Sequence, residues 1–173
     1  MDQLNPVEQK IVSVGLRREI ITFYRERIRS VFRPKEGLYD YPQALDLLLQ
    51  AKKHYPDSVA LSTIEDQVKE QKDRLMNSLI SLYNRYLNGK KLVKSDNGED
   101  LTTVLPLIKR VDPKHFLLKD SKLADLYLSE AEKFISNRKY KDASNYIITG
   151  LKLFPDDIRL QSLNRQINAQ FIN

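Results

Sequence analysis

Apolar residues recur every three or four positions along almost the whole chain, which is the spacing of one helix face. This pattern breaks at Pro34, Pro56, Pro113 and Pro155, and proline ends helices because it lacks an N–H and clashes with the preceding turn. The uninterrupted segments predict helices over 6–33, 41–55, 57–88, 101–112, 114–137, 139–154 and 156–171. No stretch of useful length alternates as a strand does, so the pattern predicts an all-α fold.

Three stretches qualify this assignment. Segment 57–88 contains no Pro or Gly, but the polar run Lys69–Asp73 leaves open whether it is one helix or two. Segment 89–100 is polar and contains an Asn-Gly turn signal, so we expect a surface loop. Pro106 lies within the expected helix 101–112, where it is tolerable only near the first turn.

The chain repeats part of its own sequence. Residues Tyr41–Gln71 align without a gap on Tyr140–Gln170 at a constant offset of 99. Eight of the 31 pairs are identical, where ordinary composition would give about two. The identical pairs are Tyr41/Tyr140, Ala44/Ala143, Lys53/Lys152, Pro56/Pro155, Asp57/Asp156, Leu61/Leu160, Gln67/Gln166 and Gln71/Gln170. A repeated helical pattern predicts a stacked array, whose usual role is to bind another molecule.

The clearest repeat unit is segment 124–157, which alternates small and large residues at helical spacing. Small residues let two antiparallel helices approach closely, large ones fill the spaces beside them, and a proline ends the second helix. The packing positions expected in this unit are Tyr127, Ala131, Phe134, Ala143, Ile147, Gly150 and Pro155. The pattern resembles the tetratricopeptide repeat (TPR). It departs from that family at Tyr127, Glu130 and Ile147, where Trp, Leu and Phe are usual.

A second unit supports the resemblance over its second helix, with packing positions at Ala44, Leu48, Ala51 and Pro56. The middle stretch, roughly 73–113, matches the repeat pattern poorly. The resemblance implies a single helical-repeat domain over 1–173, with antiparallel helical hairpins stacked as a short, TPR-like right-handed array. The hairpins would span about 6–55, 57–112 and 114–154, with a terminal capping helix over 156–171.

Composition narrows the possible functions. The chain has 173 residues, a net charge of +6 and no cysteine, which excludes disulfides, thiolate zinc sites and cysteine nucleophiles. No apolar run reaches membrane-spanning length and no export signal is visible, so we expect a cytoplasmic protein without a membrane span. The sequence leaves open whether the chain is a fragment of a larger protein, and also its oligomeric state.

Catalytic motifs are missing from the sequence. His54 and His115 lack metal-ligand spacing, and each lies beside a helix break, where a surface or capping role is favoured over catalysis. There is no phosphate-binding glycine loop, serine elbow or zinc motif. We therefore predict that the chain is not an enzyme and uses no cofactor and no metal.

The resemblance also implies where a ligand would bind. In that family the first helix of each hairpin lines a concave groove, so helices 8–33, 73–88 and 121–136 would form it. The expected contact positions are Arg25, Arg29, Asp125, Leu128, Glu132 and Lys133. The leading hypothesis is a non-catalytic protein–protein interaction module that binds a protein or peptide.

Two alternatives stay open. One is a regulatory accessory domain of a larger protein, such as a bacterial signalling kinase. The other is nucleic-acid binding through the basic first helix. Glu19 and Glu26 interrupt the basic residues of that helix, which favours a solvated helix with local ion pairs over nucleic-acid binding.

Overall fold

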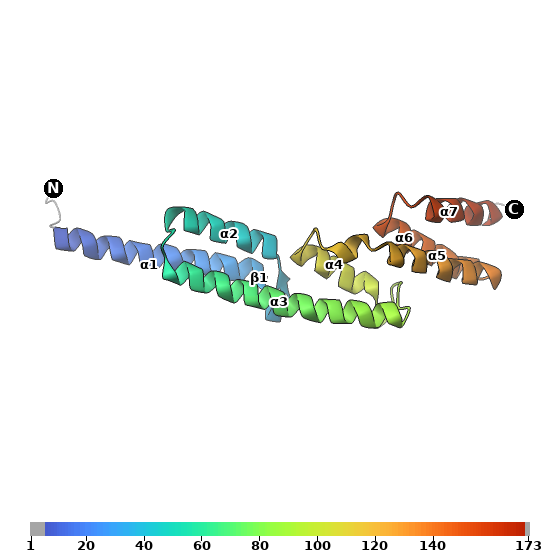
Figure 1. Ribbon diagram of the computed structural model, residues 1–173, viewed down its shortest axis with the longest axis horizontal. Helices are drawn as coiled ribbons and strands as arrows, with labels where there is room; N and C mark the ends of the chain where they lie inside the picture. The colour runs from blue at the N-terminus through green and yellow to red at the C-terminus, as the bar shows by residue number, and fades with distance from the viewer. Residues whose placement is uncertain (1–5, 172–173) are drawn as a thin grey trace. The chain divides into compact units, whose positions relative to one another are not determined.

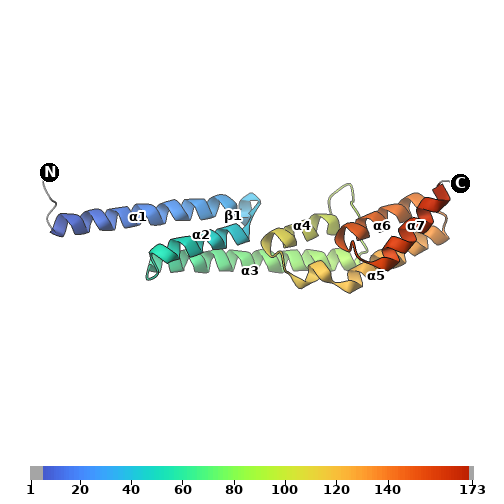
Figure 2. The same cartoon turned by 90° about the horizontal axis from the view of Figure 1, so that it is seen from above.

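The computed structural model describes residues 6–171, and the side chains of residues 13–169. Within these residues the protein is mostly helical, at 78% with seven helices, as the apolar periodicity predicts. Figures 1 and 2 show the helices along the chain. They are α1 (Pro6–Val31), α2 (Tyr41–His54), α3 (Val59–Asn88), α4 (Leu101–Val111), α5 (Ser121–Ser136), α6 (Tyr140–Leu153) and α7 (Ile158–Phe171). The elements outside these helices are strands β1 (Phe32–Arg33) and β2 (Leu38–Tyr39) and the 3-10 helices η1 (Pro34–Glu36) and η2 (Phe116–Lys119).

The chain divides into two compact units between Asn77 and Ser78. We call them unit 1 and unit 2 and describe each by itself. Helix α3 is continuous from Val59 to Asn88 and contributes residues to both units. The polar run at Lys69–Asp73 therefore does not divide the helix, and the question of one helix or two is settled in favour of one.

In unit 1, helices α1 and α2 pack against each other and against the first part of α3. The core combines Ile28 and Phe32 with the inner faces of α2 and α3. Its buried residues are Ile28, Phe32, Ala44, Leu47, Leu48, Ala51, Leu61, Ile64 and Val68. The side chains of Lys52 on α2 and Glu65 on α3 form an ion pair across the two helices.

A short antiparallel hairpin joins α1 to α2. Phe32 pairs with Tyr39 and Arg33 with Leu38, and Gly37 between the strands has a φ of 79°, a conformation that glycine adopts at little cost. The apolar pattern does not predict this hairpin, because strands of two residues carry no detectable alternation. The hairpin starts immediately after Val31, which ends α1 before the expected limit at residue 33.

Unit 2 contains the Ser78–Asn88 part of α3 and helices α4 to α7. Helices α5, α6 and α7 pack successively against one another around Ala131, Ala143, Ile147 and Ile167. Helix α4 lies beside the end of α3 in both views (Figures 1 and 2). Its inner face is fully apolar, with Leu101, Val104, Leu105, Ile108 and Val111 buried.

Within the expected segment 114–137, the sequence offers a second helix start at Asp120-Ser121, which supply a capping side chain. Helix α5 begins there: the Asp120 side chain accepts a hydrogen bond from Lys122 N at 3.0 Å, and η2 precedes it. Pro106 is the sixth residue of α4, beyond its first turn, and the helix continues to Val111. Burial of the apolar face of α4 offsets the one backbone hydrogen bond that proline removes.

The repeated sequence has the same local structure in both units. Helices α2 and α6 each have 14 residues, and α3 and α7 start at positions 99 apart. The residues that follow α2 and α6 have similar backbone angles, with φ and ψ of −135° and 65° at Tyr55 and −126° and 68° at Phe154. The two aligned segments therefore agree in helix length, helix start and turn geometry.

No helix among the residues that the structure describes is long and apolar enough to cross a membrane.

Candidate functional site

Burial is equivalent at the repeated packing positions. Ala44 and Ala143 are fully buried, as are Leu61 and Leu160. The other packing positions named from the sequence are also buried, except that Phe134 is half-buried and the turn residues Pro56 and Pro155 are exposed. The small residues are thus buried between helices, as their expected packing role requires.

Gly150 lies at a close contact with neighbouring helices in unit 2. A methyl group added there would lie 3.0 Å from Leu160 Cδ1 and 3.1 Å from Tyr127 Cβ, inside ordinary carbon–carbon contact. The equivalent residue of unit 1 is Ala51, which is fully buried. The two units therefore differ by one buried methyl group at this position.

The contact positions predicted in unit 2 are largely engaged within the protein. Asp125 Oδ1 accepts a hydrogen bond from Arg159 Nη1 at 2.7 Å, which ties α5 to α7. Lys133 donates to Glu130 at 2.7 Å. Glu132 is exposed and Leu128 is half-buried. Among the described side chains, the Glu132 carboxylate has no ion pair and no hydrogen bond. It is the exposed contact position of unit 2 that the fold leaves unused.

Glu130 connects α5 to the segment that follows α3. Its carboxylate also accepts a hydrogen bond from Lys90 Nζ at 2.8 Å. The neighbouring ammonium groups of Lys133 and Lys90 hold the pKa of Glu130 below its ordinary value. Glu130 is one of the positions at which the sequence departs from the TPR pattern, and it forms ionic contacts.

Arg25 and Arg29, the contact positions predicted in unit 1, differ in their surroundings. Arg29 forms an ion pair with Glu26 at 3.2 Å. Arg25 has no such partner among the described side chains and lines a cleft on α1. The groove expected over residues 8–33, 73–88 and 121–136 draws on both units, so it stays a prediction.

The cleft that includes Arg25 lies between α1 and the first turn of α3. Its volume is about 470 Å³. Its lining is Val14, Arg17, Arg18, Ile21, Thr22, Arg25 and Ala60, and we call it the arginine cleft. The guanidinium of Arg17 lies 5.4 Å from the centre of the Tyr55 ring, a cation–π contact that fixes its position. The described lining contains three cationic side chains and no carboxylate.

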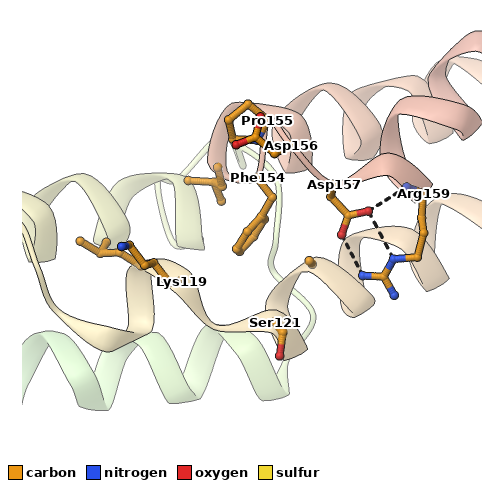
Figure 3. Close-up of a pocket in the computed structure, with 10 residues that line it drawn as sticks. Lys119, Ser121, Phe154, Pro155, Asp156, Asp157 and Arg159 are labelled. Atoms are coloured by element: carbon orange, nitrogen blue, oxygen red, sulfur yellow. Dashed lines mark hydrogen bonds and ion pairs between the residues drawn. The ribbon is translucent and has the colours of Figure 1, made fainter.

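A second cleft lies in unit 2, where the end of α6 and the start of α7 meet the start of α5 (Figure 3). We call it the α7 cleft; its volume is about 310 Å³. Phe154 points from the end of α6 towards the segment that carries Lys119 and Ser121 (Figure 3). Asp157 and Arg159 form an ion pair at 2.8 Å on its wall, and the Arg159 guanidinium holds the pKa of Asp157 below its ordinary value. The charges of Asp157 and Arg159 in this cleft thus compensate each other.

The sequence analysis missed a buried polar cluster around Asp100. The Asp100 carboxylate accepts hydrogen bonds from Ser95 N at 2.7 Å, Ser95 Oγ at 2.8 Å and Thr102 Oγ1 at 2.6 Å, and it caps α4 through Thr103 N at 3.2 Å. Burial alone would raise the pKa of Asp100, but these hydrogen bonds outweigh burial and hold it below its ordinary value. The Asp-x-x-Thr spacing at the helix start is a capping signal that could have revealed part of this cluster.

The two histidines have structural surroundings. His115 Nδ1 accepts a hydrogen bond from Leu117 N at 3.4 Å and caps η2, the capping role favoured by its place beside a helix break. His54 is exposed in the last turn of α2. The described residues contain no group of three or more His, Cys, Asp and Glu side chains that could hold a metal ion.

In comparisons with known proteins, no family model matches the chain, and no curated protein or solved structure matches it.

Proposed function

We propose that the chain is a non-catalytic protein–protein interaction module of TPR-like type that binds a protein or peptide ligand in the cytoplasm. The observation that carries this proposal is the structural repeat. Two separate segments of the chain form the same helix, turn and helix start, with the pairs Ala44/Ala143, Leu48/Ile147 and Leu61/Leu160 buried in both. Duplicated helical hairpins of this kind present surfaces for other macromolecules.

The surface chemistry supports binding over catalysis. The arginine cleft leaves two guanidinium groups, those of Arg18 and Arg25, without a hydrogen-bonding partner among the described side chains. The carboxylates of Asp125 and Glu130 on α5, by contrast, are engaged in ion pairs within the protein. A charged surface that the fold itself does not use is available to a partner.

The test is affinity capture with the intact chain, followed by identification of the captured protein and calorimetric titration of that protein after purification. We expect saturable one-to-one binding by the folded chain and none by the same chain after thermal unfolding. Failure of every captured protein to bind directly would contradict the proposal. A reproducible turnover that is abolished by substitution of His54 or His115 would contradict its non-catalytic part.

A further inference from the structure

The two clefts share one equivalent pair of lining residues but differ in charge. Arg159, in the first turn of α7, lines the α7 cleft, and Ala60, its equivalent at an offset of 99, lines the arginine cleft from the first turn of α3. In unit 2, Arg159 on α7 pairs with Asp125 on α5 at 2.7 Å. In unit 1, Ala60 on α3 has no charge with which to pair a residue of α1.

The arginine cleft concentrates positive charge. Arg17, Arg18 and Arg25 line it, and the described lining, including Ala60 from α3, contains no carboxylate. Guanidinium groups bind carboxylates in bidentate geometry and remain charged at all physiological pH values. The arginine cleft is therefore complementary to a ligand that brings its own carboxylates.

Apolar residues separate the arginines and set the shape of the ligand. Val14 and Ile21 lie on the same face of α1 as Arg18 and Arg25, at the helical spacing of 14, 18, 21 and 25. Arg18 and Arg25 are seven positions apart, which corresponds to about 10.5 Å along the helix. A helix lying along α1 would match them with carboxylates seven positions apart and an apolar residue between them.

We propose that the arginine cleft binds an acidic amphipathic helix of a partner protein. This inference rests on the proposed function and names the chemistry of its ligand. The cleft volume of about 470 Å³ lies within the range of about 300–1,000 Å³ that is typical of ligand clefts. Nucleic acid fits the surface less well, because the apolar side chains of Val14 and Ile21 interrupt the charge and Glu19 and Glu26 lie on the same helix.

The experiment measures binding of three fluorescent probes to the intact chain. The first is a synthetic peptide of about four helical turns with leucines on one face and glutamates seven positions apart. The second is the same peptide with glutamine for glutamate, and the third is a single-stranded oligonucleotide of equal charge. We expect the acidic peptide to bind at least about tenfold more tightly than either of the others, and binding to weaken as salt is added.

Three variants test the location. Arg18→Glu with Arg25→Glu reverses the cleft charge. Ala60→Glu adds an internal carboxylate opposite the arginines, at the start of a helix where a negative charge is favourable. Both should weaken peptide binding by about tenfold or more. The control is Lys35→Glu with Lys53→Glu, which changes the net charge equally at two exposed residues away from the cleft and should alter binding less than about twofold.

Each outcome either supports or overturns the proposal that the arginine cleft binds an acidic helix. Undiminished peptide binding by the Ala60→Glu variant, or preference for the oligonucleotide, would overturn the inference, and so would failure of the acidic peptide to bind. If the double arginine variant loses its helical circular dichroism, the Ala60→Glu variant alone gives the answer. A chain that binds a captured protein but not the acidic peptide refutes only this inference, whereas a chain that binds neither also refutes the proposed function.

Discussion

Exchange of glycine and alanine at the equivalent positions Gly150 and Ala51 should destabilise the protein in both directions. In Gly150→Ala, the new methyl group lies 3.0 Å from Leu160 Cδ1, 3.1 Å from Tyr127 Cβ and 3.2 Å from Tyr127 Cγ. The terminal methyl of Leu160 can rotate away. The Cβ of Tyr127 is attached to the backbone of α5, so α5 itself must shift.

Two opposing terms set the magnitude. Alanine is favoured over glycine inside a helix by about 1 kcal/mol, and overpacking of a buried site costs about 1–3 kcal/mol. Because the backbone of α5 must move, we expect Gly150→Ala to lower the free energy of unfolding by about 1 kcal/mol. In Ala51→Gly both terms act together: the helix preference of about 1 kcal/mol and about 0.8 kcal/mol for one buried methyl group are lost.

The assay is urea denaturation followed by circular dichroism, with amide hydrogen exchange to assign the loss to unit 1 or unit 2. Gly15→Ala on α1 is the matched control, because a methyl group there meets no atom within 4 Å and should keep or raise local stability. A Gly150→Ala variant that is about 1 kcal/mol more stable than the parent would refute the close approach of α5 and α6.

Three further variants test the packing and polar contacts of unit 2. Ala143→Leu should cost about 1–3 kcal/mol by overpacking the α5–α6 contact, whereas Asn145→Leu on the exposed face of α6 should leave the denaturation midpoint nearly unchanged; equal midpoints would contradict the repeat packing. Tyr127→Phe removes the hydrogen bond that the hydroxyl donates to Leu92 O at 2.5 Å and should cost about 1–2 kcal/mol, since a buried carbonyl loses its donor; unchanged stability would contradict this contact. Asp100→Asn should cost about 2 kcal/mol at neutral pH and reduce the loss of stability in acid. Folding lowers the pKa of Asp100 below its ordinary value of 3.8. The ionised Asp100 carboxylate therefore stabilises the fold fully at neutral pH, and this stabilisation is lost as the pH falls below 3.8 and through the pKa of the folded state. If the parent and Asp100→Asn lose the same free energy of unfolding between neutral and acidic pH, measured by urea denaturation, the prediction is contradicted.

The sequence predicts helices α2 and α6 to within one residue, because Pro56 and Pro155 end both copies in the same way. The repeat also identifies the buried positions, since Ala44 and Ala143 retain a small residue where two helices meet. Local signals of this kind are readable because proline, capping residues and apolar spacing act over a few positions.

Contacts between residues that lie far apart in the sequence could not be predicted from it. Lys90 pairs with Glu130 and Asp125 with Arg159, at separations that no periodic pattern encodes. The two-residue strands at Phe32–Arg33 and Leu38–Tyr39 are equally invisible, because alternation needs a longer run. The exchange of Arg159 for Ala60 is visible in the aligned repeats, but its meaning depends on which side chains share the cleft.

The most direct test of the central claim is nuclear magnetic resonance of the ¹⁵N-labelled intact chain, titrated with the purified partner found by affinity capture. We predict saturable shifts of amide signals around the arginine cleft, at Arg17, Arg18, Arg25 and Ala60, with the buried signals of Ala143 and Ile147 unchanged. Titration of a verified partner that moves none of the arginine-cleft signals, or that moves only those of the α7 cleft, would contradict the account.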